Sequence, residues 1–213
     1  MASVDLQNFR QEYSKGVLIE ESLPEEPFPL LLQWLEEAVQ AGISEPNAFT
    51  LATADSSGQP HARIVLLKEV VVPFLFFYTN YESAKGVEIA QNPKVSATFW
   101  WRELERQLRV EGTAQKASEE KSNTYFLSRP YGSQIGAWAS PQSQPIKREE
   151  LMSRWQLYME KFAEGEVPRP PYWGGYQILP HYVEFWQGRP NRLHDRIIYR
   201  RRGTSWEKYR IAP

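Results

Sequence analysis

Short strand-like segments separated by turn residues recur along most of this chain, and they constrain its fold more than any other feature. The segments are rich in β-branched and aromatic residues, which favour strands, and Gly, Pro, Ser or Asn residues separate them. In chain order they are AFTLATAD (48–55), HARIVLLKEV (61–70), FLFFYTN (74–80), KVSATFWW (94–101), ERQLRVEGTAQ (105–115), YWGGYQILP (172–180), YVEFWQG (182–188), RIIYRRRG (196–203) and SWEKYRIAP (205–213). The turn SSGQ predicts a hairpin from the first two segments, and the last four segments predict a strand meander.

Four other segments carry helix signals instead, either apolar residues at helical spacing or a serine at the start. Residues 27–42 start with prolines and end at a glycine, and residues 147–165 carry one stripe of large apolar side chains. Residues 83–92 and 118–129 each begin with a serine in the position of a helix cap. Because the strands outnumber the helices, we predict a mainly β fold, an antiparallel barrel with peripheral α-helices packed outside.

Length, charge and composition exclude several classes of protein. A chain of 213 residues has the length of one domain, and it has no apolar run near the roughly 20 residues that a membrane helix needs. It contains no cysteine, which excludes disulfides and thiolate chemistry, and its first residues lack the pattern of a secretory signal. The net charge is −1 and no nucleic-acid-binding motif is present, despite the basic run at residues 200–202. We therefore expect a cytoplasmic protein without membrane or nucleic-acid partners.

The common catalytic signatures are missing, and anion binding is the chemistry that remains. There is no Gly-rich nucleotide loop, no His-Glu-x-x-His and no serine nucleophile elbow, and three scattered histidines predict no metal site. In FYTNYESAKG (77–86), a strand leads into a helix whose first turn offers free N–H groups, the hydroxyls of Thr79 and Ser83, and the ammonium of Lys85. Such a helix end can hold a phosphate. The alternative is a capped helix with a solvated lysine.

Two further stretches place cations among apolar or hydroxyl residues. In RIVLLK, Arg63 and Lys68 flank four apolar residues, so strict alternation puts the two charges on opposite faces unless the strand ends or bulges. The alternative is a buried central strand with charged ends. In YFLSRPYGSQIGAW (125–138), Tyr125, Arg129 and Ser133 line up if one helix continues past Pro130.

The stretch NRLHDR (191–196) places one of the three histidines between two arginines. If the stretch is extended, Arg192, His194 and Arg196 share one face, and Leu193 and Asp195 point to the other. The alternative is a solvated edge strand with an incidental imidazole. Arginine forks grip phosphate oxygens, and side chains such as Trp186, Gln107 and Gln142 can stack on or hydrogen-bond a heterocycle. Together these stretches predict one or two aromatic phosphate ligands.

Eight of these motifs occur in one order along the chain: RIVLLK, FYTNYESAKG, ERQLRVEG, SRPYGSQIGAWAS, YWGGY, VEFWQG, RLHDR and the terminal RIAP. In this combination the chain resembles the pyridoxine/pyridoxamine 5′-phosphate oxidase family of the bacterial type, almost from end to end. The resemblance implies an FMN-binding split β-barrel and a homodimer whose flavin lies at the interface, held by residues of both chains. It also implies that residues 1–20 are a flexible segment that acts as an active-site lid. Residues 21–213 then form one split-barrel domain, which includes the C-terminal strands for dimerisation and substrate binding.

The resemblance also implies roles for individual residues. FMN is expected to be bound by Arg63, Ile64, Val65, Leu66, Leu67, Lys68, Tyr78, Thr79, Lys85, Gln107, Gln142, Ser143, Trp186 and Arg196. The substrate is expected to be bound by Lys68, Tyr125, Arg129, Ser133, Arg192, Leu193, His194, Arg10 and Tyr13. Arg192 and His194 are the implied catalytic residues. Arg192 is expected to orient the substrate because guanidinium keeps its proton, whereas His194 either accepts a proton or orients the substrate.

One position departs from the family pattern. Family members commonly carry an arginine just before the lysine that matches Lys85, and this chain has Ala84 there. One contact to the FMN phosphate is therefore lost or supplied by another residue.

The implied reaction is the oxidation of pyridoxine 5′-phosphate and pyridoxamine 5′-phosphate to pyridoxal 5′-phosphate. Oxygen is the acceptor and hydrogen peroxide is released. Three alternatives remain open on the sequence: a related flavin oxidase of another aromatic substrate, as in phenazine biosynthesis; a split barrel that binds flavin or haem without catalysis; and a pyridoxal phosphate carrier.

Overall fold

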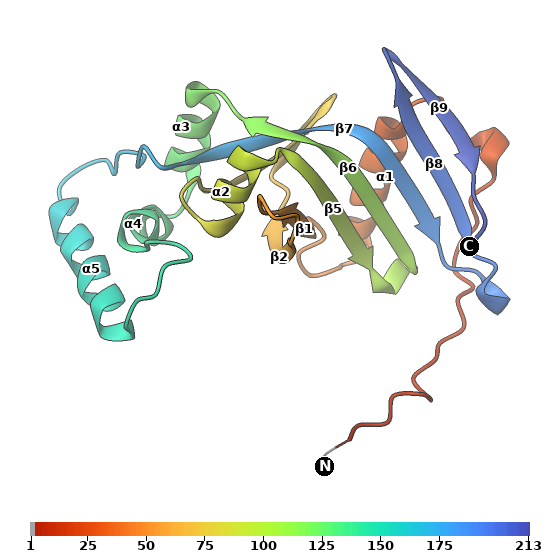
Figure 1. Ribbon diagram of the computed structural model, residues 1–213, viewed down its shortest axis with the longest axis horizontal. Helices are drawn as coiled ribbons and strands as arrows, with labels where there is room; N and C mark the ends of the chain where they lie inside the picture. The colour runs from red at the N-terminus through yellow and green to blue at the C-terminus, as the bar shows by residue number, and fades with distance from the viewer. Residues whose placement is uncertain (1–2) are drawn as a thin grey trace. The chain divides into compact units, whose positions relative to one another are not determined.

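The computed structural model describes residues 3–213 (Figure 1), and these divide into two compact units. Of the described residues, unit 1 comprises those up to Pro46, Thr98–Val110 and His181–Pro213, and unit 2 comprises Asn47–Ala97 and Glu111–Pro180. Each unit is thus assembled from segments that are distant in the sequence. That residues 21–213 act as one domain stays a prediction.

The strands form an antiparallel sheet, as the turn-rich sequence predicts. They are β1 (Ala48–Ala54), β2 (Pro60–Leu66), β3 (Glu69–Val71), β4 (Phe74–Asn80), β5 (Lys94–Trp101), β6 (Arg106–Lys116), β7 (Trp173–Gln187), β8 (Asp195–Arg202) and β9 (Ser205–Arg210). The strand order is β2-β1-β5-β6-β7-β4-β3, and β8 pairs with β7 and β9. The predicted hairpin is present, with Ala48 opposite Leu66 and Ala54 opposite Pro60. Strands β5, β6 and β7 each contribute residues to both units.

The four predicted helices are present with small changes at their ends, and the structure adds a fifth, α4, which was not predicted. They are α1 (Pro27–Gln40), α2 (Ala84–Gln91), α3 (Glu119–Ser128), α4 (Tyr131–Ala139) and α5 (Arg148–Lys161), with short 3₁₀ turns η1 (Glu20–Ser22), η2 (Arg102–Leu104) and η3 (Pro190–Arg192). Ser118 caps α3 as predicted, because its side chain accepts a hydrogen bond from the backbone N–H of Lys121. Ser83 precedes α2 but does not cap it through its side chain; its hydroxyl donates to the carbonyl of Asn80 at 2.7 Å.

Two predicted strand boundaries were wrong. The segment 61–70 is interrupted, since β2 ends at Leu66 and β3 begins at Glu69. The segments 172–180 and 182–188 are a single strand, β7, which passes through Pro180 instead of turning there. Along β7, the pairing with β4 ends at Ile178 and the pairing with β8 begins at Tyr182. Pro180 lies between these two paired stretches. Its missing N–H therefore removes no hydrogen bond from the pairing with β4 or from the pairing with β8.

The stretch 191–196 is not the extended strand that the sequence predicts. Pro190 to Arg192 form η3, and Asn191 and Arg192 have positive φ angles of 56° and 61°. Proline favours the start of a helical turn, and asparagine tolerates the left-handed region, so a turn competes successfully with the strand here. Strand β8 begins only at Asp195, and the alternation of faces expected for residues 192–196 does not apply. Leu193 does not anchor a strand, because it is 69% exposed.

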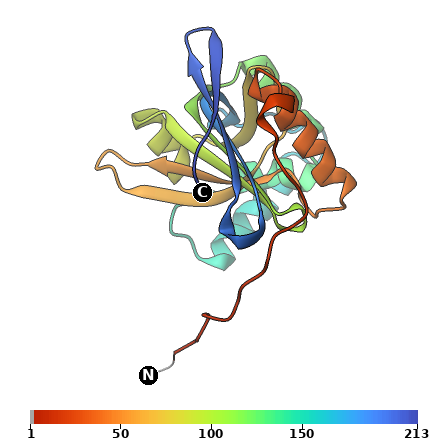
Figure 2. The ribbon, with the colours of Figure 1, turned by 90° about the vertical axis from the view of Figure 1, so that its right-hand side faces the viewer.

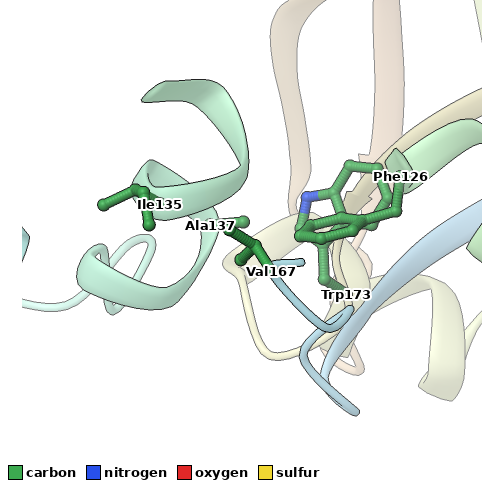
Figure 3. Close-up of a cluster of buried hydrophobic side chains, with 5 residues drawn as sticks. All are labelled: Phe126, Ile135, Ala137, Val167 and Trp173. Carbon is green, nitrogen blue, oxygen red and sulfur yellow. The ribbon is translucent and has the colours of Figure 1, made fainter. Parts of the chain in front are cut away.

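Aromatic side chains contribute to the core of each unit. In unit 1, the ring of Trp34 packs edge-on against Phe185 at a centroid distance of 5.0 Å. Helix α1 begins beside the β8–β9 hairpin, where Phe28 packs edge-on against Trp206 (Figure 2). In unit 2, a cluster joins α3, α4 and the segment leading into β7 (Figure 3), and its buried members are Phe126, Ile135, Ala137, Val167 and Trp173.

We expect Phe126→Ala to lower the free energy of unfolding by about 3–5 kcal/mol, because it empties a fully buried site against Trp173. Leu127→Ala is the matched control, since Leu127 is the next residue of α3 and its side chain is 46% exposed. That control should change the free energy by less than about 0.5 kcal/mol. Urea titration followed by tryptophan fluorescence measures both. Equal losses in the two variants would contradict the assignment of this cluster as core.

Candidate active site

Unit 2 contains a cavity of about 860 Å³ with cations in its walls. Its walls come from β2, the end of β4, the start of α2, the junction between α3 and α4, and the loop after α4. The lining residues are Arg63, Ile64, Val65, Leu66, Lys68, Tyr78, Thr79, Asn80, Ala84, Lys85, Tyr125, Arg129, Pro130, Ser133, Gly136, Ala137, Ser140, Gln142, Ser143 and Trp173. Strict strand alternation would put Arg63 and Lys68 on opposite faces. Strand β2 ends at Leu66, so Lys68 lies beyond it and the alternation does not apply, and both cations line one cavity.

Lys85 is a buried cation whose hydrogen-bond partners are all uncharged. Its ammonium donates to Ser83 Oγ at 3.0 Å, to Thr79 Oγ1 at 3.2 Å and to Gln142 Oε1 at 3.3 Å, and the residue is only 7% exposed. Burial, together with the nearby positive charge of Arg63, lowers the pKa of Lys85 from 10.5 to about 8. An anion in the cavity would supply the charged partner that this ammonium lacks.

Arg63 is held in place by a buried carboxylate. Its guanidinium pairs with Glu88 at 3.1 Å and also donates to the hydroxyl of Thr53. Glu88 also faces His61, with 2.9 Å between Nδ1 and Oε1. Burial tends to raise the pKa of Glu88, but hydrogen bonds from Thr53 and Arg63 lower it overall, so Glu88 is ionised at neutral pH. Arg63 therefore lines the cavity in a fixed orientation.

Arg129 lies in the cavity wall with part of its hydrogen-bonding capacity unused. Its guanidinium stacks over the ring of Trp173 at 4.5 Å. Among residues 3–213, its Nη1 is the buried side-chain polar atom without a hydrogen-bond partner. Burial lowers the pKa of Arg129, but a guanidinium stays charged at neutral pH. An unpaired buried donor of this kind is costly unless a ligand completes it.

Two stacked tyrosines also line the cavity. The rings of Tyr78 and Tyr125 are nearly parallel, with centroids 3.8 Å apart. Burial raises the pKa of Tyr78 to about 12, so its hydroxyl remains a hydrogen-bond donor throughout the neutral range. The cavity therefore offers aromatic and hydroxyl groups beside its cations and no carboxylate in its lining.

In unit 1, the geometry around His194 defines its tautomer. The backbone N–H of Arg189 donates to His194 Nδ1 at 3.1 Å. Burial and the charge of Arg192 lower the pKa of His194, so the ring is neutral at pH 7. Because Nδ1 accepts, the ring hydrogen is on Nε2. In this form His194 can donate a hydrogen bond through Nε2 but cannot accept a proton there. The rings of Trp186 and Tyr13 lie 4.6 Å and 5.8 Å from that of His194.

Arg196, also in unit 1, is held by a carboxylate beneath it. Glu184 on β7 is 1% exposed and accepts from Arg196 Nε at 2.7 Å. The same carboxylate accepts from Arg109, and these two arginines keep the pKa of Glu184 low although burial acts to raise it. In the sheet, Arg196 lies directly opposite Trp186.

Two family descriptions match this sequence. Residues 35–154 match the family described as pyridoxamine 5′-phosphate oxidase, and residues 173–213 match the C-terminal dimerisation region of pyridoxine 5′-phosphate oxidase. A pyridoxine/pyridoxamine 5′-phosphate oxidase from Rubrobacter xylanophilus is 50% identical over 210 residues, 98% of this chain and 97% of that protein. One from Bordetella pertussis is 49% identical over 99% of this chain and all of that protein. This chain belongs to the pyridoxine/pyridoxamine 5′-phosphate oxidase family. The predicted enzyme class, an oxidoreductase of this family, is thereby confirmed.

Solved structures agree with the family assignment. The crystal structure of PhzG from Burkholderia lata, in complex with tetrahydrophenazine-1-carboxylic acid, has a TM-score of 0.87 and 32% identity. It covers 92% of this chain and 98% of its own. A pyridoxamine 5′-phosphate oxidase-related, FMN binding protein from Nostoc punctiforme shares the fold with a TM-score of 0.70, at 17% identity. The predicted fold class, a mainly β antiparallel split barrel with peripheral helices, is confirmed.

The structure brings together the predicted residues of unit 2. All of them except Leu67 line the cavity, and Leu67 is buried in the core. The other predicted residues belong to unit 1: Arg10, Tyr13, Gln107, Trp186, Arg192, Leu193, His194 and Arg196. Their binding roles stay predictions.

The sequence reasoning missed one wall of the cavity. Gly136 and Ala137 on α4, and Ser140 directly after it, line the cavity together with Ser133. They follow Ser133 by three, four and seven residues, which is the helical repeat, and this spacing was the available signal. This spacing was missed because the chain breaks at Arg129 and Pro130, where α3, the helix that carries Tyr125, ends before α4 begins.

Within residues 3–213, no group of three or more metal-binding side chains comes together, and no helix is long and apolar enough to span a membrane.

We expect this cavity to bind a small phosphate monoester more weakly as the pH rises through 8. Below its pKa of about 8 Lys85 is charged and attracts the anion, whereas above it the amine is neutral. The monoester itself has a second pKa near 6 and stays a dianion in this range. The association constant should therefore fall by up to about tenfold per pH unit above pH 8, measured by calorimetry between pH 7 and 9.5.

Lys85→Met is the control for this titration. Its weaker binding should not vary with pH over the same range, because methionine cannot titrate. Affinity that is independent of pH in the unmodified protein would contradict the assignment. Without ligand, the unmodified protein should gain stability from pH 8 toward 10.5, since the unfolded chain holds this proton more tightly.

Proposed function

We propose that this protein uses FMN to oxidise pyridoxine 5′-phosphate and pyridoxamine 5′-phosphate to pyridoxal 5′-phosphate. Oxygen is the acceptor in this proposal and hydrogen peroxide is released. The observation that carries it is one cavity lined by four cations, Arg63, Lys68, Lys85 and Arg129, in a chain from this family. In this proposal Lys85 and Arg63 bind the phosphate of the cofactor, and Lys68 and Arg129 bind that of the substrate.

The residues around Lys85 fit FMN chemically. The ammonium of Lys85 and the guanidinium of Arg63 suit a phosphate, and the hydroxyls of Thr79 and Ser143 suit a polyol chain. Ile64 is 65% exposed on β2 and lines the same cavity, which suits the apolar face of a flat ring. When bound, FMN supplies the acceptor for the hydride that leaves the substrate.

The residues around Arg129 suit the phosphate of the substrate. The unpaired Nη1 of Arg129 and the ammonium of Lys68 provide charge, and the hydroxyls of Tyr125 and Ser133 provide neutral donors. Holding the phosphate at this end tethers the pyridine ring, so the chain contributes mainly by positioning.

Arg192 and His194 are assigned to orientation in this proposal. A guanidinium does not lose its proton at accessible pH, so Arg192 does not act as a base. Neutral His194 carries its hydrogen on Nε2, so it donates a hydrogen bond to a substrate oxygen. In this proposal a group other than Arg192 or His194 accepts the proton released from the substrate alcohol or amine. Neither residue is assigned as the general base.

We further infer that the enzyme is a homodimer with FMN at the subunit interface. The match of residues 173–213 to a dimerisation region supports this inference. The roles proposed for Gln107, Trp186 and Arg196 at the flavin, and for Arg10, Tyr13 and Leu193 at the substrate, follow from the family resemblance.

The second candidate function is oxidation of a phosphate-free aromatic acid, and the likeness to PhzG favours it. Such a substrate needs no second phosphate site. The further cavity cations Lys68 and Arg129, and the unpaired donor of Arg129, therefore argue for the phosphorylated pyridine.

One assay tests the proposal. Purified protein is incubated with FMN, oxygen and each phosphorylated vitamer, while aldehyde and peroxide are followed. We expect equal amounts of both products, and we expect Arg192→Ala to lower kcat at least about 100-fold, because orientation is lost. FMN affinity should change less than about threefold in that variant. No aldehyde from either vitamer would refute the function, and unchanged turnover in Arg192→Ala would refute the role of this arginine.

We expect Ala84→Arg to tighten FMN binding by about tenfold or more. Ala84 lines the cavity at the start of α2, and a charged hydrogen bond to phosphate contributes about 1.5–3 kcal/mol. Val87→Arg is the matched control, because it adds the same charge on the same helix at a residue that is 45% exposed and outside the cavity lining. Fluorescence titration of FMN measures both variants. Equal affinities would show that Ala84 does not face the phosphate.

A further inference from the structure

The turn that carries Arg192 and His194 has a few bonds of its own: the backbone N–H of Leu193 donates to the carbonyl of Pro190 at 3.1 Å, that of Arg189 donates to His194 Nδ1, and Arg189 pairs with Asp195 at 3.6 Å. The turn runs from Arg189 to Asp195 and contains two residues with positive φ, Asn191 and Arg192. Its middle is solvent-exposed, with Leu193 making little contact with the core. Non-glycine residues in the left-handed region are costly, and they persist only where surrounding contacts over-determine the backbone. Besides these internal bonds, contacts from another segment act at the two ends of the turn.

Both ends of the turn are bonded to one N-terminal segment, Tyr13–Leu18, which we call the strap. At the first end, Arg189 Nη1 donates to the carbonyl of Gly16 at 2.8 Å. At the second end, Asp195 Oδ2 accepts from the backbone N–H of Leu18 at 3.1 Å. Arg210 completes this second contact, because it donates to the carbonyl of Leu18 at 2.7 Å and to Asp195 Oδ1 at 2.6 Å.

The strap also lies very close to the chain around the turn. A Cβ atom added to Gly188 would come within 2.7 Å of Tyr13, and one added to Gly16 would come within 2.5 Å of Gln187. The ring of Tyr13 packs edge-on against Trp186 at 5.7 Å and faces His194. Displacement of the strap would therefore remove contacts from both ends of the turn and from the imidazole.

The strap is held at its other end by Glu105. This carboxylate accepts hydrogen bonds from the backbone N–H of Ser14 at 2.7 Å and of Lys15 at 2.9 Å through one oxygen, Oε2. Glu105 is 8% exposed and has a positive φ of 54°. A buried carboxylate on a left-handed residue is unfavourable by itself, and here its bonds go to the strap. Charge-assisted bonds to backbone N–H groups are the strong kind.

We propose that Glu105 is a positioning residue for the candidate active site. It fixes the strap, and the strap fixes the turn that presents Arg192 and His194. Through Arg189 the connection is short: the guanidinium of Arg189 bonds to the strap, and its backbone N–H bonds to His194 Nδ1. The effect on turnover rests on the proposed function, whereas the effect on the strap does not.

The first measurement is the rate of tryptic cleavage after Lys15 in the folded protein, followed by mass spectrometry. Lys15 lies within the strap, and its ammonium donates to the carbonyl of Glu103 at 2.6 Å. Glu105→Ala should be cleaved there at least tenfold faster than Glu103→Ala, the matched control, which removes a nearby carboxylate and keeps that carbonyl. Glu105→Gln should fall between the two, because an amide oxygen accepts the same bonds without the charge. Equal cleavage in Glu105→Ala and Glu103→Ala would overturn the proposal.

The second measurement is kinetic. Glu105→Ala should lower kcat for the phosphorylated vitamers at least tenfold while the FMN dissociation constant changes less than threefold, and Glu105→Gln should recover most of the loss. Faster cleavage with unchanged kcat would show that the strap does not position the turn, and would overturn the proposal.

A double-variant cycle covers the case in which Glu105→Ala does not fold. Glu105→Gln and Arg189→Gln both act through the strap, so the combined variant should lose no more kcat than the more damaging single one. Losses that multiply would overturn the coupling. If the unmodified protein oxidises neither vitamer, the proposed function fails, while the cleavage rates of the same variants still decide whether Glu105 holds the strap.

Discussion

Buried positive charge without enough negative charge is the constraint on which this site depends. Lys85 has only neutral partners, and Arg129 keeps a buried donor unpaired. Burial in the walls of the cavity desolvates both charges, and this costs free energy unless a bound anion compensates them. Glu88 compensates Arg63 and fixes its direction, but the remaining cations of the cavity stay available. Two phosphate-bearing ligands would restore this balance, which is why the electrostatics and the family membership point to the same chemistry.

In unit 1 the constraint is one of backbone position, because the predicted catalytic residues lie on a turn and not on a strand. Arg192 and His194 follow a left-handed backbone, and the surrounding bonds act at Arg189 and Asp195. A separate bond, from the backbone N–H of Arg189 to His194 Nδ1, sets the tautomer of the imidazole, so the neutral ring presents a donor at Nε2. The orienting role of His194 stays a proposal.

The local signals in the sequence were reliable where short-range chemistry decides the outcome. Alternation and turn residues predicted the β1–β2 hairpin, and the cap at Ser118 was correct because its bond is local. They failed at Pro180 and at residues 191–196. In the first case the gap between two strand registers accommodates a proline, and in the second Pro190 and Asn191 favour a turn. Neither result can be read from a strand pattern alone.

By itself, the sequence determined the mainly β class and, through the resemblance, the family and the cavity residues Arg63, Lys85 and Arg129. Residue types and their order suffice for this, since they set strand propensity and the kinds of charge available. Only the tertiary structure decided that Lys68 and Arg63 line one cavity, that α4 provides a wall, and that Glu105 bonds to Ser14 and Lys15. These contacts join residues far apart in the chain, and burial, which sets their charge balance and pKa values, exists only after the chain has folded.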